Sequence, residues 1–159
     1  MASVSNSDRR LIKRASDFLL ERYEPKRHHA AAAVRCGKRS YLSLHLDTSG
    51  FDVCAEASAV AKAIVAGEER IDAVVAVLWD GSKGCLPAVV PPCGDCRQLL
   101  LEYAPSADVL LCDEEGELLS VKAEELLPYP YRSQGSFKLL DFAKAHESRV
   151  KHPKERRVN

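Results

Sequence analysis

The chain has 159 residues, which is enough for one domain with a substantial core. Its 23 basic and 23 acidic residues balance, so charge gives no reason to expect nucleic acid or a membrane surface as a partner. The sequence has no apolar run of the about 18 residues that a membrane-spanning helix needs, and its first residues, MASVS, lack the apolar core of a signal peptide. Because a chain of this size does not need its six cysteines as a disulfide framework, we expect a reducing, cytoplasmic setting.

The first third of the chain predicts a helix followed by a β hairpin. Apolar residues recur at helical spacing over residues 7–23, and Ser5 or Ser7 is suited to cap the N-terminus of this helix. Small and apolar residues then predict a strand over 30–35, and Leu alternates with polar residues in a second strand over 41–46. A short turn containing Gly separates the two strands, so we expect them to pair with each other.

The remaining elements alternate between helices and strands. An Ala-rich helix is expected over 54–66, with Asp52 as its N-cap, and a nearly continuous apolar run over 71–79 predicts a strand buried on both faces. Residues 80–91, which contain Gly and Pro, are expected to form a loop. The later elements are a helix over 93–103, a strand over 109–112, a short strand at 118–119 and a short helix over 121–127. This alternation predicts a three-layer α/β fold, with five strands and helices on both faces of the sheet.

The composition changes after residue 131. We expect residues 1–131 to form a single domain and residues 132–159 to form a C-terminal extension. Apolar spacing in the extension suggests a helix over 137–146, and the basic residues 152–159 are expected to fray. A basic run this short is more often solvated than bound to nucleic acid.

Two short stretches carry residues typical of a metal site. Cys93 and Cys96 are three positions apart, which places both thiols on one face of a helical turn and is the spacing of a metal-binding pair. Cys54 is able to complete a three-thiolate site with an open fourth position, as in a catalytic zinc centre. Glu56 follows two positions later, close enough to face a water in the open position. The other cysteines lie in apolar sequence and are expected to be core thiols: Cys36, Cys85 and Cys112.

The chain resembles the zinc-dependent cytidine deaminase superfamily through two motifs, Cys-Ala-Glu at 54–56 and Pro-Cys-Gly-Asp-Cys-Arg-Gln at 92–98. A cysteine as first ligand is similar to the small homotetrameric branch, which contains cytidine deaminases and blasticidin S deaminase. The similarity runs from about residue 30 to about residue 131. It implies the cytidine deaminase fold with a mixed five-stranded sheet, one zinc ion per chain held by Cys54, Cys93 and Cys96, and a homotetramer, with a dimer as the alternative. It also implies that Glu56 shuttles protons during hydrolytic deamination.

Three thiolates give a zinc centre a net negative charge, which opposes the formation of hydroxide. The N-termini of the two helices that supply the ligands are one source of compensating positive charge. The resembling cytidine deaminases commonly carry an Arg directly after Cys-Ala-Glu, whereas this sequence has Ala57, and blasticidin S deaminase also lacks that Arg. Arg97 is the candidate replacement, and a surface or subunit-contact role for Arg97 is the alternative.

The residues expected to bind the substrate differ from those of the resembling enzymes. His28 stands where cytidine deaminases carry a Phe that stacks on the base, and His45 and Asp47 stand where they carry Asn and Glu that bind the ribose. Tyr131 is similar to an aromatic residue that reaches a neighbouring subunit's pocket. Each of these residues has an alternative reading as an ordinary structural or surface side chain. Because sites that recognise hydroxyl groups discriminate strongly, the changed pair favours a substrate other than ordinary cytidine.

We therefore expect a zinc-dependent hydrolytic deaminase that acts on a small aminopyrimidine nucleoside. Within this class, a blasticidin S-type antibiotic deaminase and a modified-base or aminopurine deaminase are the alternatives. A second class is a catalytically silent zinc module that binds a nucleoside or a partner, which the retained Glu56 argues against. A third is a polynucleotide-editing deaminase, which the balanced charge and the lack of interleaved aromatic and basic residues disfavour.

Overall fold

The computed structural model describes residues 3–131. The chain divides after Pro128 into two compact units, and of the second unit the structure describes residues 129–131. The linker, helix and basic tail expected after residue 131 lie outside the described residues. None of the helices in the described part of the chain combines the length and the apolar character that a membrane span requires.

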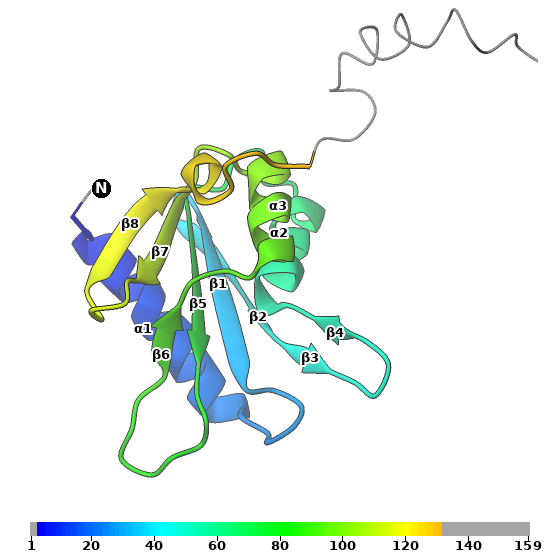
Figure 1. Ribbon diagram of the computed structural model, residues 1–159, viewed down its shortest axis with the longest axis vertical. Coiled ribbons are helices and arrows are strands. Elements are labelled where there is room, and N and C mark those ends of the chain that lie inside the picture. The colour runs from blue at the N-terminus through cyan, green and yellow to red at the C-terminus, as the bar shows by residue number, and fades with distance from the viewer. Residues whose placement is uncertain (1–2, 132–159) are drawn as a thin grey trace, which may run out of the picture. The chain divides into compact units, whose positions relative to one another are not determined.

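Helix α1 spans Asn6–Arg22 (Figure 1), which confirms the predicted first helix to within one residue at each end. Ser5, rather than Ser7, is its N-cap. The Ser5 Oγ accepts a hydrogen bond from the Asp8 N–H at 3.2 Å, and the Asp8 carboxylate accepts one from the Ser5 N–H at 2.9 Å. This reciprocal capping box satisfies amide donors at the helix N-terminus.

Within the described residues, the main sheet has six strands, one more than expected. The strand order is β2-β1-β5-β7-β8, and β6 pairs with β5 beside this path. The β5–β7 pairing is parallel and the other pairings are antiparallel, so the sheet is mixed. A separate ribbon is formed by β3 and β4. The strands are β1 Ala30–Cys36, β2 Arg39–Leu44, β3 Leu46–Asp47, β4 Asp52–Val53, β5 Ala73–Leu78, β6 Ala88–Val90, β7 Asp108–Cys112 and β8 Leu118–Lys122.

The sixth strand, β6, corrects the expectation of a simple loop over residues 80–91. Ala76, Val77 and Leu78 of β5 pair with β6, whereas the three preceding residues of β5 pair with β7. Because β1 occupies the other edge of β5 along its whole length, β6 and β7 follow one another along the same edge. The loop before β6 is thereby anchored to the centre of the sheet.

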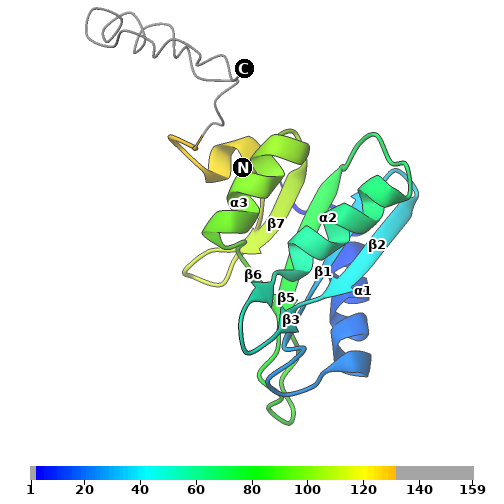
Figure 2. The same cartoon turned by 90° about the vertical axis from the view of Figure 1, so that its right-hand side faces the viewer.

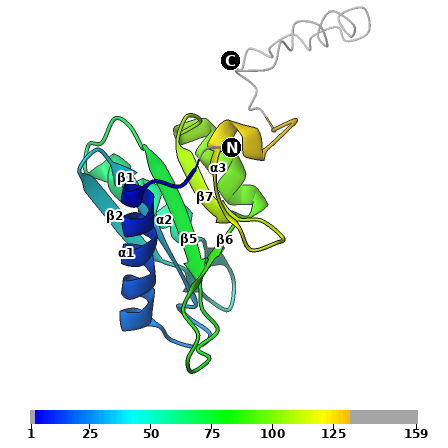
Figure 3. The ribbon, with the colours of Figure 1, turned by 90° about the vertical axis from the view of Figure 1, so that its left-hand side faces the viewer.

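The helices cover both faces of the sheet, as predicted. Helix α1 lies on one face, and helices α2 (Ala55–Val65) and α3 (Gly94–Tyr103) lie on the other (Figures 2 and 3). Along β1, Ala31 and Ala33 belong to the apolar cluster under α1, while Ala32 and Val34 belong to the cluster under α2 and α3. Small side chains suit this central strand because helices pack closely against both of its faces. This observed three-layer arrangement confirms the α/β fold class.

Three local predictions need correction. Asp52 does not cap α2, because it lies in β4 opposite Asp47, and the N-cap of α2 is Cys54. The short helix expected over 121–127 is present as a 3₁₀ helix at Ala123–Leu126, and residues 121–122 belong to β8 instead. Of the expected core thiols, Cys36 is buried and Cys112 is half-buried, but Cys85 is exposed.

A half-buried ion pair joins α1 to the sheet and gives stability a pH dependence. The Arg35 guanidinium donates to the Asp8 carboxylate at 2.6 Å. Burial pushes the pKa of Asp8 upward, but the hydrogen bonds from Ser5 and Arg35 outweigh burial and hold the pKa of Asp8 below its ordinary value. The charged form of Asp8 therefore stabilises the folded chain.

We expect Asp8→Asn to lower the free energy of unfolding by about 1.5–3 kcal/mol at neutral pH. Because the pKa of Asp8 is lower in the folded than in the unfolded chain, this difference is fully present above about pH 4–5 and shrinks as pH falls through the folded pKa. Urea unfolding of wild type and variant across pH measures it. Asp17→Asn is the matched control, since Asp17 forms an exposed pair with Lys13 on the same helix, worth less than about 1 kcal/mol. A difference that does not change with pH would contradict this account.

Candidate active site

Three thiols meet where the N-termini of α2 and α3 come together on one face of the sheet. Cys54 is the N-cap of α2 and Cys93 is the N-cap of α3, and neither side chain makes a capping hydrogen bond. Cys96 lies in the first turn of α3 and is 1 % exposed. Both Cys54 and Cys93 thus keep their thiols available at the positive ends of two helix dipoles, which favour negatively charged groups.

The distances between the thiols fit a single zinc ion. The Cys54 and Cys93 sulfurs are 3.6 Å apart, and the sulfurs of Cys54, Cys93 and Cys96 all lie within 4.8 Å of one another. Two thiolates bound to tetrahedral zinc at about 2.3 Å are about 3.8 Å apart. Three converging sulfur donors, with no fourth ligand among residues 3–131, match the donor set of a zinc site that keeps one position open.

The pKa values of the thiols show what metal binding must overcome. Burial raises the pKa of the Cys54 thiol to about 11, and its hydrogen bond to Cys93 adds to this shift. Burial, followed by the nearby negative charge of Glu56, raises the pKa of the Cys96 thiol well above its ordinary value. Without a metal these two thiols remain protonated at pH 7, so zinc binding would displace their protons and stabilise the thiolates.

Glu56 lies beside the thiols with no hydrogen-bond partner for its carboxylate among the described residues. It occupies the first turn of α2 and is 8 % exposed. Its charge acts on both Cys54 and Cys96, which places the carboxylate next to the thiol cluster. A buried carboxylate is normally hydrogen-bonded within the fold, so an unpartnered one beside three thiols is suited to act on a bound water or substrate.

Arg97 lies next to the loop that carries Cys93. Its Nε donates a hydrogen bond to the Pro92 carbonyl at 2.9 Å, and its backbone N–H donates to the Cys93 carbonyl at 2.9 Å. The side chain therefore fixes the residue that precedes the first ligand of α3. The compensation of thiolate charge by Arg97 stays a prediction.

A second polar cluster contains two of the predicted substrate-binding residues and one that the sequence analysis missed. His29, His45 and Asp47 place one ligand atom each within 4.8 Å of one another, and the His29 and His45 rings are 4.6 Å apart. Backbone hydrogen bonds fix the cluster: the His45 N–H donates to Ala30 at 2.8 Å and the Asp47 N–H donates to Arg27 at 3.1 Å. The only sequence signal for His29 is its place directly before β1, one residue after His28.

The two remaining predicted substrate residues are placed differently. The His28 Nδ1 lies 3.0 Å from the His45 carbonyl oxygen, so this ring atom already has a backbone partner. The ring of His29, rather than that of His28, joins the cluster of His45 and Asp47. Tyr131 belongs to the second unit, and its role at a subunit contact stays a prediction.

Comparison with known proteins agrees with this site. The model of the cytidine and deoxycytidylate deaminase zinc-binding region matches residues 5–112. The blasticidin-S deaminase of Bacillus cereus is 34 % identical over 134 residues, covering 81 % of this chain and 95 % of that protein. The cytidine deaminase of Mycoplasma genitalium is 28 % identical over 121 residues, covering 74 % and 89 %. Among solved structures, the cytidine deaminase of Burkholderia pseudomallei is 25 % identical with a TM-score of 0.61, covering 77 % of this chain and 98 % of that one.

The family match includes all three converging thiols and Glu56, and it spans well over half of the chain. The Bacillus cereus relative matches over nearly its whole length, so the relationship concerns the entire catalytic unit and not an isolated motif. The chain belongs to the cytidine and deoxycytidylate deaminase zinc-binding family and is a zinc-dependent hydrolytic deaminase.

Proposed function

We propose that the protein removes the exocyclic amine of a small aminopyrimidine nucleoside by hydrolysis, with a blasticidin S-type nucleoside as the favoured alternative to cytidine. The observation that carries this proposal is the unpartnered Glu56 carboxylate beside the cluster of Cys54, Cys93 and Cys96. The relative in Bacillus cereus supports the blasticidin S alternative. The free state of all six cysteines fits the reducing, cytoplasmic setting that we infer.

The chain's own residues account for the proton movements of this reaction. Zinc held by the three cysteines would lower the pKa of water so that hydroxide forms near neutral pH. Glu56 takes a proton from the attacking water and delivers it to the ring nitrogen next to the reacting carbon. Glu56 then takes the remaining proton from the hydroxyl group that attack has placed on the carbon. As the carbon–nitrogen bond breaks, Glu56 passes this second proton to the departing amine, which leaves as ammonia while the oxygen stays on the ring as a carbonyl.

The cluster of His29, His45 and Asp47 is suited to hold the substrate's sugar or its substituent. A neutral imidazole donates one hydrogen bond and accepts another, and a carboxylate accepts hydrogen bonds from hydroxyl groups. The Asp47 carboxylate also attracts a cationic substituent. The backbone hydrogen bonds of β1, β2 and β3 hold these side chains in place before a substrate arrives. Such preorganisation reduces the entropy lost on binding.

The substrate is tested by ammonia release from cytidine, deoxycytidine, cytosine, blasticidin S and an aminopurine nucleoside, with the zinc-loaded protein. We expect a blasticidin S-type or other sugar-modified nucleoside to give the highest kcat/KM. Highest kcat/KM with plain cytidine would overturn the proposed preference. Binding of a nucleoside with no ammonia release from any compound would favour the silent binding module.

Replacing His29 by Ala in one variant and His28 by Ala in another tests which histidine contacts the substrate. We expect His29→Ala to raise KM by about tenfold, because one substrate hydrogen bond is lost, while kcat and zinc content stay near wild type. His28→Ala is the matched control, with a smaller expected effect since the His28 Nδ1 already faces the His45 carbonyl. A larger increase in KM for His28→Ala would restore the assignment made from the sequence.

The assembly implied by the resemblance also remains a proposal. Apolar side chains are exposed near the ribbon and in the loop before β6, including Leu46, Phe51 and Leu86. A homotetramer, or the alternative dimer, would remove such side chains from water.

A further inference from the structure

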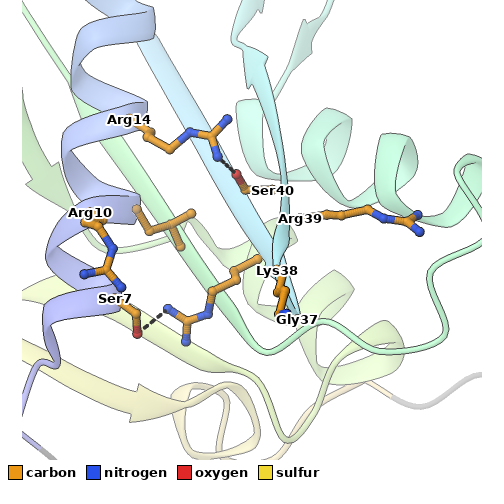
Figure 4. Close-up of a pocket in the computed structure, with 9 residues that line it drawn as sticks. Ser7, Arg10, Arg14, Gly37, Lys38, Arg39 and Ser40 are labelled. Atoms are coloured by element: carbon orange, nitrogen blue, oxygen red, sulfur yellow. Dashed lines mark hydrogen bonds between the residues drawn. The ribbon is translucent and has the colours of Figure 1, made fainter.

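A pocket of about 370 Å³, lined mostly by basic and hydroxyl-bearing residues, lies between α1 and the turn that joins β1 to β2. Figure 4 shows its lining, with Arg14 reaching from α1 to Ser40 of the hairpin and the Arg10 side chain lying along α1. Helix α1 packs on the face of the sheet opposite α2 and α3, whose N-termini carry the thiols (Figures 2 and 3). The pocket is therefore separate from the catalytic site. Its lining residues are Ser7, Arg10, Leu11, Arg14, Arg35, Gly37, Lys38, Arg39 and Ser40.

The sequence of the hairpin changes from apolar to polar where this pocket begins. On the face that packs under α1, β1 presents Ala31 and Ala33 and then Arg35. The neighbouring strand β2 presents Leu44 and Leu42 to the same cluster and then Ser40, which pairs directly with Arg35. The alternation of side chains between the two faces of the sheet thus continues past the end of the core. At these last positions, side chains that donate hydrogen bonds stand in place of apolar ones. Arg35 and Ser40 therefore form a polar surface that faces α1.

The turn brings a further positive charge to the rim of the pocket. Gly37 and Lys38 form the two-residue connection between Cys36 and Arg39. Gly37 has a φ of 58°, which other residues rarely adopt and which two-residue hairpin turns require. The Gly37 N–H is held by the Asp72 carboxylate at 2.6 Å, so the position of Lys38 is fixed by the turn.

The positive charges of the pocket exceed the negative ones. Arg35 is neutralised by Asp8 at 2.6 Å, and the guanidinium of Arg39 turns out of the pocket to Glu68 at 3.1 Å. Arg14 donates to the Ser40 hydroxyl. For Arg10, Arg14 and Lys38, the structure shows no carboxylate partner among residues 3–131. Like charges one helical turn apart, as in Arg10 and Arg14, destabilise a helix, and a bound anion would remove this repulsion.

We propose that this pocket binds a phosphate-bearing anion, either pyrophosphate or the phosphate chain of a nucleotide. Guanidinium groups match phosphate oxygens in geometry and charge, and the Ser7 and Ser40 hydroxyls line the same space. The volume suits a small ligand rather than an extended polymer. The overall balance of acidic and basic residues also gives no continuous basic surface on which a nucleic acid would lie.

Calorimetric titration of the full-length, zinc-loaded protein at low ionic strength tests the proposal with inorganic phosphate, pyrophosphate and a nucleoside triphosphate. We expect pyrophosphate or the triphosphate to bind more tightly than phosphate, and the affinity to fall as salt screens the arginines. Equal affinity for pyrophosphate and triphosphate would assign recognition to the phosphates alone. Tighter binding of the triphosphate would identify a nucleotide as the source.

Adjacent arginines on α1 provide a matched pair of variants. Arg10 lines the pocket, whereas Arg9 is exposed on the same helix outside the lining. We expect Arg10→Gln to weaken binding about tenfold, because a charge-assisted hydrogen bond is lost, and Arg9→Gln to leave it nearly unchanged. Chelation of zinc by pyrophosphate affects both variants equally. Equal weakening in both would show non-specific attraction and overturn the proposal, as would no binding of any of the three anions.

A third variant removes a negative charge instead of a positive one. Asp8→Asn leaves Arg35 without its carboxylate partner and is expected to tighten binding of the same anion. All three variants lie on the α1 side of the sheet, so ammonia release without added anion is expected to stay at the wild-type rate. Weaker anion binding by folded Asp8→Asn would contradict the electrostatic account.

Discussion

Replacing Glu56 by Gln is expected to lower kcat by about 10²–10⁴-fold, the range typical of losing a general acid–base group. The amide has nearly the shape of the carboxylate but cannot take a proton from water. Glu56 is 8 % exposed and has no hydrogen-bond partner in the described part of the chain, so the substitution breaks no structural contact of its carboxylate. The free energy of unfolding is therefore expected to stay close to that of wild type.

Zinc content and substrate binding separate this effect from a damaged site. Glu56→Gln is expected to retain one zinc per chain and to bind a nucleoside with near-wild-type affinity, as measured by metal analysis and calorimetry. Glu68→Gln is the matched control, because Glu68 is a half-buried glutamate that serves structure by accepting from the Tyr41 hydroxyl at 2.5 Å. It should lose stability and keep kcat. Full turnover by Glu56→Gln would remove Glu56 from the mechanism.

The long, strongly patterned elements were predictable because their determinants are local. Helix α1 follows from apolar spacing and a capping box formed by Ser5 and Asp8, all within one stretch of chain. The hairpin of β1 and β2 follows from two apolar runs around a Gly-containing turn. The approach of the cysteines was expected from the resemblance to zinc-dependent deaminases, which combine a Cys-Ala-Glu motif with a later Pro-Cys-x-x-Cys motif, and the structure brings the three thiols together.

Elements that depend on distant backbone partners were not predictable in the same way. Strand β6 has three residues in a stretch containing Gly and Pro, and it exists because Ala76–Leu78 of β5 offers a free edge. Asp52 is a good N-cap residue by type, but its pairing with Asp47 in the ribbon places it before the helix start. In both cases a tertiary contact overrides local preference.

The substrate-binding cluster and the anion pocket could not be predicted, because the sequence does not show in which direction each side chain points. His28 and His29 are neighbours, and only the pairing of the strands shows that His29 meets His45 and Asp47. Likewise, nothing in sequence spacing joins Arg10 and Arg14 to Lys38. They line one pocket because α1 crosses the sheet beside the end of the hairpin. Convergence of this kind depends on the packing of layers, which a single sequence does not specify.

Replacing Cys96 by Ser is expected to remove zinc and turnover together. Cys96 is 1 % exposed and lies within 4.8 Å of the other two thiols, so the serine hydroxyl takes its place without a large change in volume. A neutral hydroxyl is a much weaker zinc ligand than a thiolate. Removing groups that only support a metal ligand lowers affinity by about 10–100-fold, so the loss of a ligand itself is expected to exceed about 100-fold.

Thermal unfolding adds a readout that activity alone does not give. Because zinc binds the folded chain, its binding free energy contributes to stability, and added zinc is expected to raise the Tm of wild type but not that of Cys96→Ser. Cys36→Ser is the matched control, since Cys36 is a buried cysteine outside the thiol cluster. It should lower Tm by disturbing the core while keeping one zinc per chain and the response to added zinc. One tightly bound zinc in Cys96→Ser would show that this thiol is not a ligand, and two thiols at the helix N-termini would then have to hold the ion alone.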